Sequence, residues 1–227
     1  MDHSTVLLLT HENGKCFSFY IHDCHTKTRF VKGPEIKISG DKFRVLRANQ
    51  TILDVYNNDK LWRMTFEDED LWSSAKEIGT NPTNVMCFYS QGRLFGIQQE
   101  IKESSLVVVR WDDSEIEGKP VKVQKLTFWE TSYTHEVCTS PIAFESGFLF
   151  VVRISDMKKK LHLHRLVWMD SGFKVTKFTL KFYLQKRSHE HVFSLCFHQD
   201  KLLLGCTATD REKGFLASIP LLKFTNV

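Results

Sequence analysis

Short apolar runs separated by polar turns dominate the pattern of the chain. The runs are rich in Val, Ile, Leu, Phe and Tyr, and almost nowhere does a long apolar stripe follow the i, i+3, i+4, i+7 spacing of a helix. This pattern predicts strands and an almost entirely β chain. The best candidate for a helix is 67–77, where acidic residues precede an apolar stretch, and the same segment also fits a single turn within a loop.

Four segments of the chain align with one another as strand, tight turn, strand, looser loop and strand. They comprise 43–48 with 51–56 and 61–68, 85–89 with 94–98 and 106–113, 141–144 with 148–152 and 161–170, and 192–197 with 202–206 and 214–219. Their tight turns are expected at Asn49-Gln50, Gln91-Gly92, Ser146-Gly147 and Gln199-Asp200. Apolar and polar residues alternate in 34–38, 121–128 and 173–180, which predicts outer strands with one wet face.

The third strand of three repeats ends in an aromatic residue followed by an acid. The aromatic residues are Phe66, Trp111 and Trp168, and Tyr20 is a weaker match; the intervals between the four are 46, 45 and 57 residues. A period near 45 residues persists because one four-stranded sheet cannot bury both of its faces, so such units pack around an axis. The three tryptophans at equivalent repeat positions, Trp62, Trp111 and Trp168, are predicted to lie in the core.

These repeats resemble the blades of a β-propeller, and the Trp111-Asp112 ending resembles the dipeptide after which the WD40 class is named. The resemblance is to a divergent form, because no repeat opens with Gly-His and Met169 separates Trp168 from Asp170. It implies an all-β fold, a small propeller of about five blades in a single domain, 1–227. The approximate blades are 1–41, 42–83, 84–138, 139–190 and 191–227. A large β-sandwich remains the alternative fold, since strand runs alone do not separate the two.

The C-terminal segment 221–227 is left over after the last repeat. Propellers commonly close their ring with strands from both termini, and closure removes an exposed sheet edge. We therefore expect 221–227 to close the ring, either by pairing with the sheet of the first unit or by completing the last one.

Composition narrows the class of protein without naming a partner. Hydrophobic residues make up 42% and charged residues 26% of the chain, which excludes wholesale disorder. A net charge of +4 is far below the concentrated positive charge of a dedicated nucleic-acid binder. No signal peptide and no membrane span is recognisable, so a cytoplasmic or nuclear protein is expected. The six cysteines form no C-x-x-C pair and are expected to be buried thiols.

The sequence carries no motif for acyl transfer, phosphate cradling, dinucleotide binding or zinc proteolysis, so neither an enzyme nor a cofactor is predicted. His162 and His164 have the spacing of two metal ligands on one strand face, but no third ligand is suitably spaced. We interpret them as a packing pair.

The function expected is that of a non-enzymatic protein–protein interaction module or scaffold subunit of an intracellular complex. Candidate partner-binding residues are aromatic residues outside the repeat core and polar or basic residues in connecting loops, where anchors and charged contacts gather. They are Trp72, Trp129, Lys158, Lys159, Lys160, Lys186, Arg187, His189 and His191. The alternatives are a ligand-binding or hydrolytic five-bladed propeller, and a nucleic-acid-binding subunit that uses the lysines of 158–187.

Overall fold

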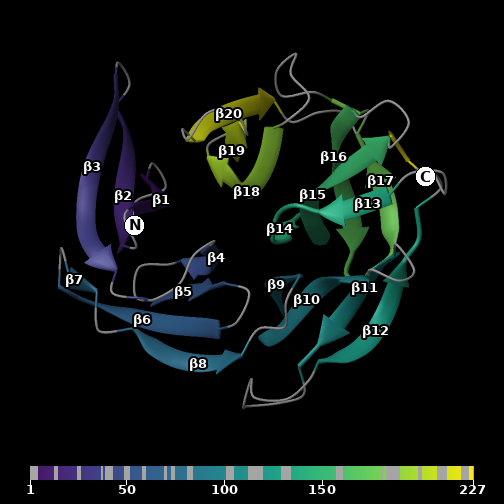
Figure 1. Cartoon of the computed structure of the whole chain (residues 1–227), viewed down its shortest axis with the longest axis horizontal. Helices are drawn as coiled ribbons and strands as arrows, with labels where there is room; N and C mark the ends of the chain where they lie inside the picture. Colours follow the sequence, from purple (N-terminus) through teal and green to yellow (C-terminus); the bar gives the residue numbers. More distant parts are fainter. Residues whose placement is uncertain are drawn as a thin grey trace. The chain divides into compact units, whose positions relative to one another are not determined.

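A computed structural model provides the coordinates of the chain. It describes residues 5–12, 15–24, 27–36, 38, 43–48, 52–57, 60–68, 71–72, 75–80, 84–100, 105–111, 120–128, 134–156, 161–179, 181–182, 190–198, 201–208, 214–220 and 225–226. The chain divides into two compact units, one made of Met1–Thr83 with Asp112–Lys119 and the other of Asn84–Trp111 with Pro120–Val227. Within the described residues every regular element is a strand, and the strands form five sheets (Figure 1).

The first unit holds two antiparallel sheets. One has the order β1 (Thr5–Glu12), β2 (Lys15–Cys24) and β3 (Lys27–Ile36). The other is built from β4 (Arg44–Ala48), β5 (Ile52–Tyr56), β6 (Lys60–Asp68), β7 (Leu71–Trp72) and β8 (Lys76–Thr80), with β7 and β8 both paired to β6. Leu53, Val55, Trp62 and Met64 form the apolar core of this second sheet.

The second unit begins with a four-stranded sheet in the order β12, β11, β10 and β9. The strands are β9 (Val85–Ser90), β10 (Arg93–Glu100), β11 (Ser105–Arg110) and β12 (Val121–Leu126). Gln91 and Gly92 connect β9 to β10, and both have positive φ, 50° and 75°. Two consecutive left-handed residues are what a two-residue hairpin turn requires, so the Gln-Gly pair works as predicted.

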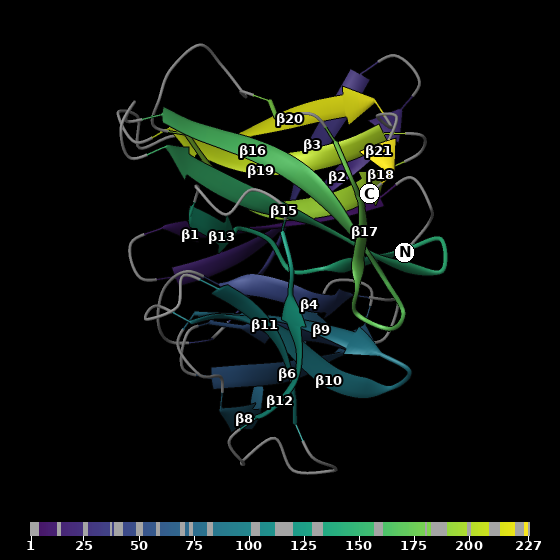
Figure 2. The ribbon, with the colours of Figure 1, turned by 90° about the vertical axis from the view of Figure 1, so that its right-hand side faces the viewer.

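The next sheet of this unit is the largest. It contains β13 (Thr134–Val137), β14 (Ile142–Phe144), β15 (Gly147–Asp156), β16 (Leu161–Asp170), β17 (Val175–Phe178) and β21 (Thr225–Asn226). Both β13 and β14 pair with β15, at opposite ends of that long strand. Figure 2 shows β15, β16 and β17 of this sheet.

The last sheet of the second unit has the order β18 (Glu190–His198), β19 (Lys201–Ala208) and β20 (Gly214–Pro220). Its middle strand buries Leu202, Leu204 and Cys206.

Among the cysteines whose side chains are described, Cys87, Cys138 and Cys206 are buried thiols as expected. Burial raises the pKa of the partly buried Cys196 thiol to about 11, so this thiol is protonated at neutral pH.

Two apolar clusters hold the three sheets of the second unit together, because β15 is covered on both faces. Successive side chains of a strand point to opposite faces. Phe148, Phe150 and Val152 accordingly join a cluster with the β9–β12 sheet, whereas Leu149 and Val151 join one with the β18–β20 sheet. A strand buried on both sides must read as a nearly continuous apolar run, and β15 does.

Trp62, Trp111 and Trp168 are all buried, which confirms the core role predicted from their repeat positions.

Gly147, which was predicted to form a turn with Ser146, has a different role in the structure. The turn before β15 is made by Glu145 and Ser146, and Gly147 is the first residue of the strand. A Cβ atom on Gly147 would overlap the backbone oxygen of Met169 and the ring of Trp168, so glycine is needed there for close packing.

Three expectations from the sequence need correction or refinement. The described residues between 67 and 77 lie in β6, β7 and β8 or next to them, so a helix there is wrong. The expectation that the C-terminal segment pairs with the first or the last sheet is wrong for Thr225 and Asn226, which pair with β17. The rest of 221–227 lies outside the described residues. β13 pairs with β15 although it precedes the blade boundary expected at 138.

Candidate functional site

His191 is the candidate residue whose side-chain surroundings the structure describes. His191 was expected in a connecting loop, but Glu190 and His191 are the first residues of β18, and His191 lies opposite Thr207 of β19. Its imidazole is exposed. The ladder pairing therefore fixes the backbone that carries this ring.

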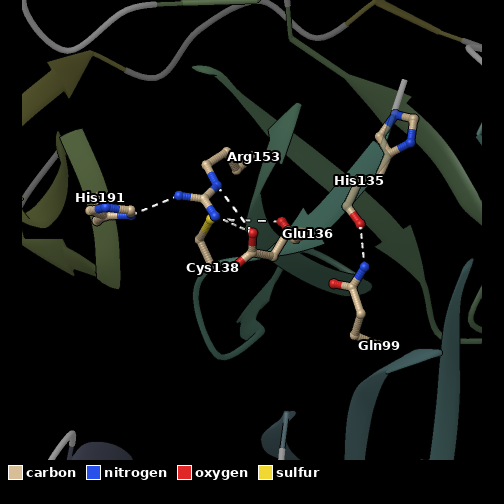
Figure 3. A network of polar contacts seen from close by, with 6 residues as sticks. All are labelled: Gln99, His135, Glu136, Cys138, Arg153 and His191. Atoms are coloured by element: carbon tan, nitrogen blue, oxygen red, sulfur yellow. Dashed lines mark hydrogen bonds and ion pairs between the residues drawn. The ribbon is translucent and has the colours of Figure 1, made fainter. Parts of the chain in front are cut away.

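Arg153 of β15 joins His191 to Glu136 of β13, as Figure 3 shows. Its Nη1 lies 2.8 Å from Nδ1 of His191, and its Nε donates a 3.1 Å hydrogen bond to Oε2 of Glu136, which Nη2 also contacts. A guanidinium group can only donate, so Nδ1 of His191 is the acceptor and the ring proton of a neutral imidazole is on Nε2. We call Glu136, Arg153 and His191 the Arg153 cluster.

The register of the sheet explains why these charges meet. Glu136 and Arg153 are directly opposite in the β13–β15 ladder, on the same face as Val151 and Leu149. The Arg153 side chain is only 15% exposed, whereas the Glu136 side chain is 51% exposed. A cation this close to an apolar cluster is stable because a carboxylate and a ring nitrogen accept its hydrogen bonds.

The opposite face of β13 is held by a second set of contacts (Figure 3). Nε2 of Gln99 donates a 2.9 Å hydrogen bond to the carbonyl oxygen of His135. The buried His135 ring stacks on Phe128, with ring centroids 4.5 Å apart and planes inclined by 14°. Just beyond the strand, Cys138 Sγ lies 3.7 Å from the carbonyl oxygen of Glu136. β13 is thus fixed on both faces, and Glu136 has a rigid backbone.

β13 is the element that sequence reasoning missed, and with it Glu136 and Arg153. A signal was present, because Thr134, His135, Glu136 and Val137 alternate between exposed and buried as strand residues do. This alternation covers only four residues, so it is too short to predict a strand in a sequence whose other strands are longer apolar runs.

The other candidate residues stay predictions. Trp72 lies in β7, opposite Phe66, and its side chain is not among those described. The remaining seven residues lie outside the described residues: Trp129, Lys158, Lys159, Lys160, Lys186, Arg187 and His189. In the part of the chain that is described, no three His, Cys, Asp or Glu side chains come together as metal ligands. The same part contains no helix long and apolar enough to cross a membrane.

A second candidate surface lies on β12, the terminal strand of its sheet (Figure 1). Among the described residues the exposed large apolar side chains are Val121, Val123 and Leu216, so two of the three lie on this strand. Val121 is 49% and Val123 is 44% exposed, and Lys122 and Lys125 are also exposed. We call these four residues the β12 surface.

The lysines of the β12 surface act on a neighbouring carboxylate. Lys122 forms an ion pair with Glu100 of β10, and its side chain nevertheless stays 66% exposed. The hydrogen bond from Lys122 is the main cause that lowers the pKa of Glu100 below its ordinary value, with smaller contributions from Ser105 and from the charge of Lys125.

Comparison with known proteins identifies the fold and no family. No protein-family model matches the chain, and no curated protein matches it. Among solved structures, the endo-arabinase from Bacteroides thetaiotaomicron VPI-5482 is similar over 97% of this chain and 90% of its own, with a TM-score of 0.56 and 10% identity. A hypothetical protein from Leishmania major is similar over 96% of this chain and 86% of its own, with a TM-score of 0.54 and 10% identity. Identities this low show the fold alone, which is all-β and propeller-like.

Proposed function

We propose that this chain is a non-enzymatic protein–protein interaction module that holds a partner on the β12 surface. The observation that carries the proposal is the exposure of Val121 and Val123 on the terminal strand of a sheet. Two of the three exposed large apolar side chains among the described residues lie on this strand, and exposed apolar surface is a feature of interaction sites.

The β8 strand gives a measure of an ordinary outer strand. Its exposed residues are Lys76, Glu77 and Thr80, and Glu77 is bound to Lys60 at 2.6 Å. This strand exposes no large apolar side chain among the residues described, and its charges are of both signs. The β12 surface differs in exposing two valines, which favours a binding role over a merely solvated edge.

The proposal extends to the finer architecture and setting. The five sheets would be the blades of one divergent WD40-like propeller spanning 1–227, with the ring closed by strands other than β21, because β21 pairs with β17. The module would serve as a scaffold subunit of a cytoplasmic or nuclear complex.

A second candidate function is supported by the Arg153 cluster. An exposed imidazole and a half-exposed carboxylate held by one guanidinium are groups that bind or hydrolyse small polar ligands. This corresponds to the ligand-binding or hydrolytic alternative. The first function is preferred because the same contacts account for the cluster as a link between β13, β15 and β18.

Affinity purification from the native cell, followed by mass spectrometry, tests the proposal. The Val121→Lys, Val123→Lys double variant should lose a partner that the wild-type protein retains. The matched control is Thr80→Lys, which adds a lysine at an exposed position of β8 and should retain that partner. If all three proteins retain the same partners, the β12 surface is not the binding site.

A further inference from the structure

We propose that Phe173 is a displaceable occupant of an aromatic-ring site in the second unit, and that a small aromatic ligand binds this site when the Phe173 turn opens. The Phe173 turn is residues 170–174, from the last residue of β16 to the residue before β17. Three observations carry the inference: a site already built around a ring, a strained backbone at that ring, and an exposed turn. The β12 surface takes no part in it.

The first observation is the site. The Phe173 ring packs against three other rings, whose centroids lie 6.1, 4.8 and 6.3 Å away: Phe88 of β9, Phe95 of β10 and Phe148 of β15. Phe88 also packs directly on Phe95, at 5.8 Å, and on Phe148, at 4.9 Å. These three rings therefore support one another without Phe173. The position that Phe173 fills suits a phenyl ring in size and in chemistry.

The second observation is the backbone of Phe173, which has a φ of 63°. This left-handed conformation is costly for a bulky residue, whereas glycine adopts it freely. The other described non-glycine residues with positive φ are polar and exposed: Asn84, Gln91 and Glu145. Phe173 is the aromatic and buried exception, so the burial of its ring compensates for the strain of its backbone.

The third observation is the exposure of the rest of the turn. Ser171, Gly172 and Lys174 are exposed, whereas Phe173 is 9% exposed. Three hydrogen bonds close the turn. The Asp170 N–H donates to the Lys174 carbonyl at 2.9 Å, the Phe173 N–H to the Asp170 carbonyl at 3.0 Å, and the Lys174 N–H to Oδ1 of Asp170 at 2.8 Å. Water replaces these bonds at an exposed turn, so opening costs little beyond the removal of the ring.

The start of β17 holds further strain beside the turn. The β16–β17 ladder skips Thr176, since Trp168 pairs with Lys177 and Met169 with Val175. Oγ1 of Thr176 is buried, with no hydrogen-bond partner among the described residues. A buried hydroxyl without a partner costs free energy, which contact with water relieves. Strained backbone, a bulge and an unpaired hydroxyl within 173–176 are features that cluster at ligand clamps and switch regions.

The open state is the minor one, because the closed state keeps the ring buried. The apparent affinity of a ligand is therefore reduced by the fraction of molecules that are open. A change that weakens the turn but leaves the site intact should raise this affinity. A fixed core residue would give no such dependence.

Titration of the full chain with toluene tests the inference, since toluene is the phenylalanine side chain as a free molecule. The readout is a saturable change in the NMR signals of Phe88, Phe95 and Phe148. In Phe173→Gly the competing ring is absent, so toluene should bind at least about tenfold more tightly than to the wild type. A folded Phe173→Gly variant that does not bind toluene would overturn the inference.

A second arm keeps Phe173 and weakens the turn. Asp170→Ala removes the acceptor of the Lys174 N–H, so toluene should bind about three- to tenfold more tightly than to the wild type. Glu145→Ala is the matched control, because it removes an exposed carboxylate from another left-handed turn of the same sheet, and it should bind like the wild type. These proteins retain the ring, so this arm holds even if Phe173→Gly fails to fold. Equal affinity of Asp170→Ala and the wild type would show that Phe173 is a fixed part of the core.

A third arm tests the strain directly by thermal unfolding. Glycine relieves a left-handed backbone, so Phe173→Gly should melt about 2–4 °C above Phe173→Ala. Lys174 is exposed and its φ is not positive, so there the order should reverse, with Lys174→Gly below Lys174→Ala. If Phe173→Gly melts below Phe173→Ala, the strain that favours opening is absent and the inference is wrong.

Discussion

β12 and β17 are outer strands that follow the same repeat pattern, but their outer edges differ. All four residues of β17 are half-buried, its edge carries β21, and Nζ of Lys177 lies 4.9 Å from the centroid of the Trp168 ring. β12 exposes two valines and two lysines, and its edge carries no described strand. A sheet edge can thus be protected in two ways: by a strand of the same chain, as on β17, or by lysines and a β-bulge, as on β12, where the ladder skips Val123. In the second way, no described strand pairs with the outer side of β12.

The largest expected change in unfolding free energy comes from substituting Trp111 and Trp168. Trp111 directly follows β11, the partner of β12, and Trp168 lies in β16, the partner of β17. Trp168→Ala should lower the free energy of unfolding by about 3–5 kcal/mol, because a buried ring is lost together with its 3.3 Å hydrogen bond to the Phe144 carbonyl oxygen. Trp111→Ala should cost about 1 kcal/mol less, since Nε1 of Trp111 has no hydrogen-bond partner among the described residues. Urea unfolding of both variants measures the difference. Equal losses of unfolding free energy in the two variants would show that the hydrogen bond from Trp168 to Phe144 contributes nothing to stability.

Lysine substitutions on the outer strands sharpen the comparison. Val175 of β17 packs partly buried against the cluster shared with the β9–β12 sheet, so Val175→Lys should cost about 1–3 kcal/mol of unfolding free energy. Val123→Lys on β12 should change it by less than about 0.5 kcal/mol, because that side chain is already exposed. Thermal and urea unfolding of the two variants check this. A large cost at Val123 would mean that the β12 surface is covered.

Removing the covering strand should make β17 resemble β12. Deletion of 225–227 removes the backbone pairing to Lys177 and Phe178, and we expect a loss of about 1–2 kcal/mol for these few hydrogen bonds. Hydrogen exchange should then accelerate at the β17 amides and remain unchanged in β12. Unchanged exchange at Lys177 and Phe178 contradicts the pairing as the source of protection.

The smallest expected effect is a change in the pKa of Glu100 when the charge of Lys122 on β12 is removed. The pKa of Glu100 is lowered chiefly by the hydrogen bond from Lys122, so Lys122→Met should raise it towards the ordinary value. A lowered pKa in the folded state stabilises the fold above the pKa of the unfolded chain, and this contribution is lost as the pH falls through the folded value. NMR titration of the Glu100 carboxyl carbon measures the shift. Lys60→Met, which removes the partner of Glu77, is the control and should leave Glu100 unchanged.

The parts of the fold predicted best are those with a local physical cause. Strands such as β10, β15 and β19 follow from apolar runs, and the buried Trp111 and Trp168 follow from their repeated position. The turn at Gln91-Gly92 follows from its glycine, which adopts positive φ without a steric cost. Gly147 shows the limit, because its role depends on the close approach of Met169 and Trp168 from another strand.

The candidate site was harder to predict, since its parts are distant in sequence. His191 was singled out as a polar residue before a repeat, but Glu136 and Arg153 became visible only when β13 paired with β15. No local pattern records that a guanidinium from one strand reaches a carboxylate and an imidazole from two others.

By itself the sequence determined strands such as β10, β15 and β19 and the alternation of their side chains, because side-chain period and turn chemistry act over a few residues. The tertiary structure alone decided which edge is covered. The runs 121–128 and 173–180 alternate in the same way and were predicted as equivalent outer strands, yet only β17 receives β21. The backbone groups that form such a pairing are identical in every residue except proline, so their occupancy depends on where a distant segment comes to lie.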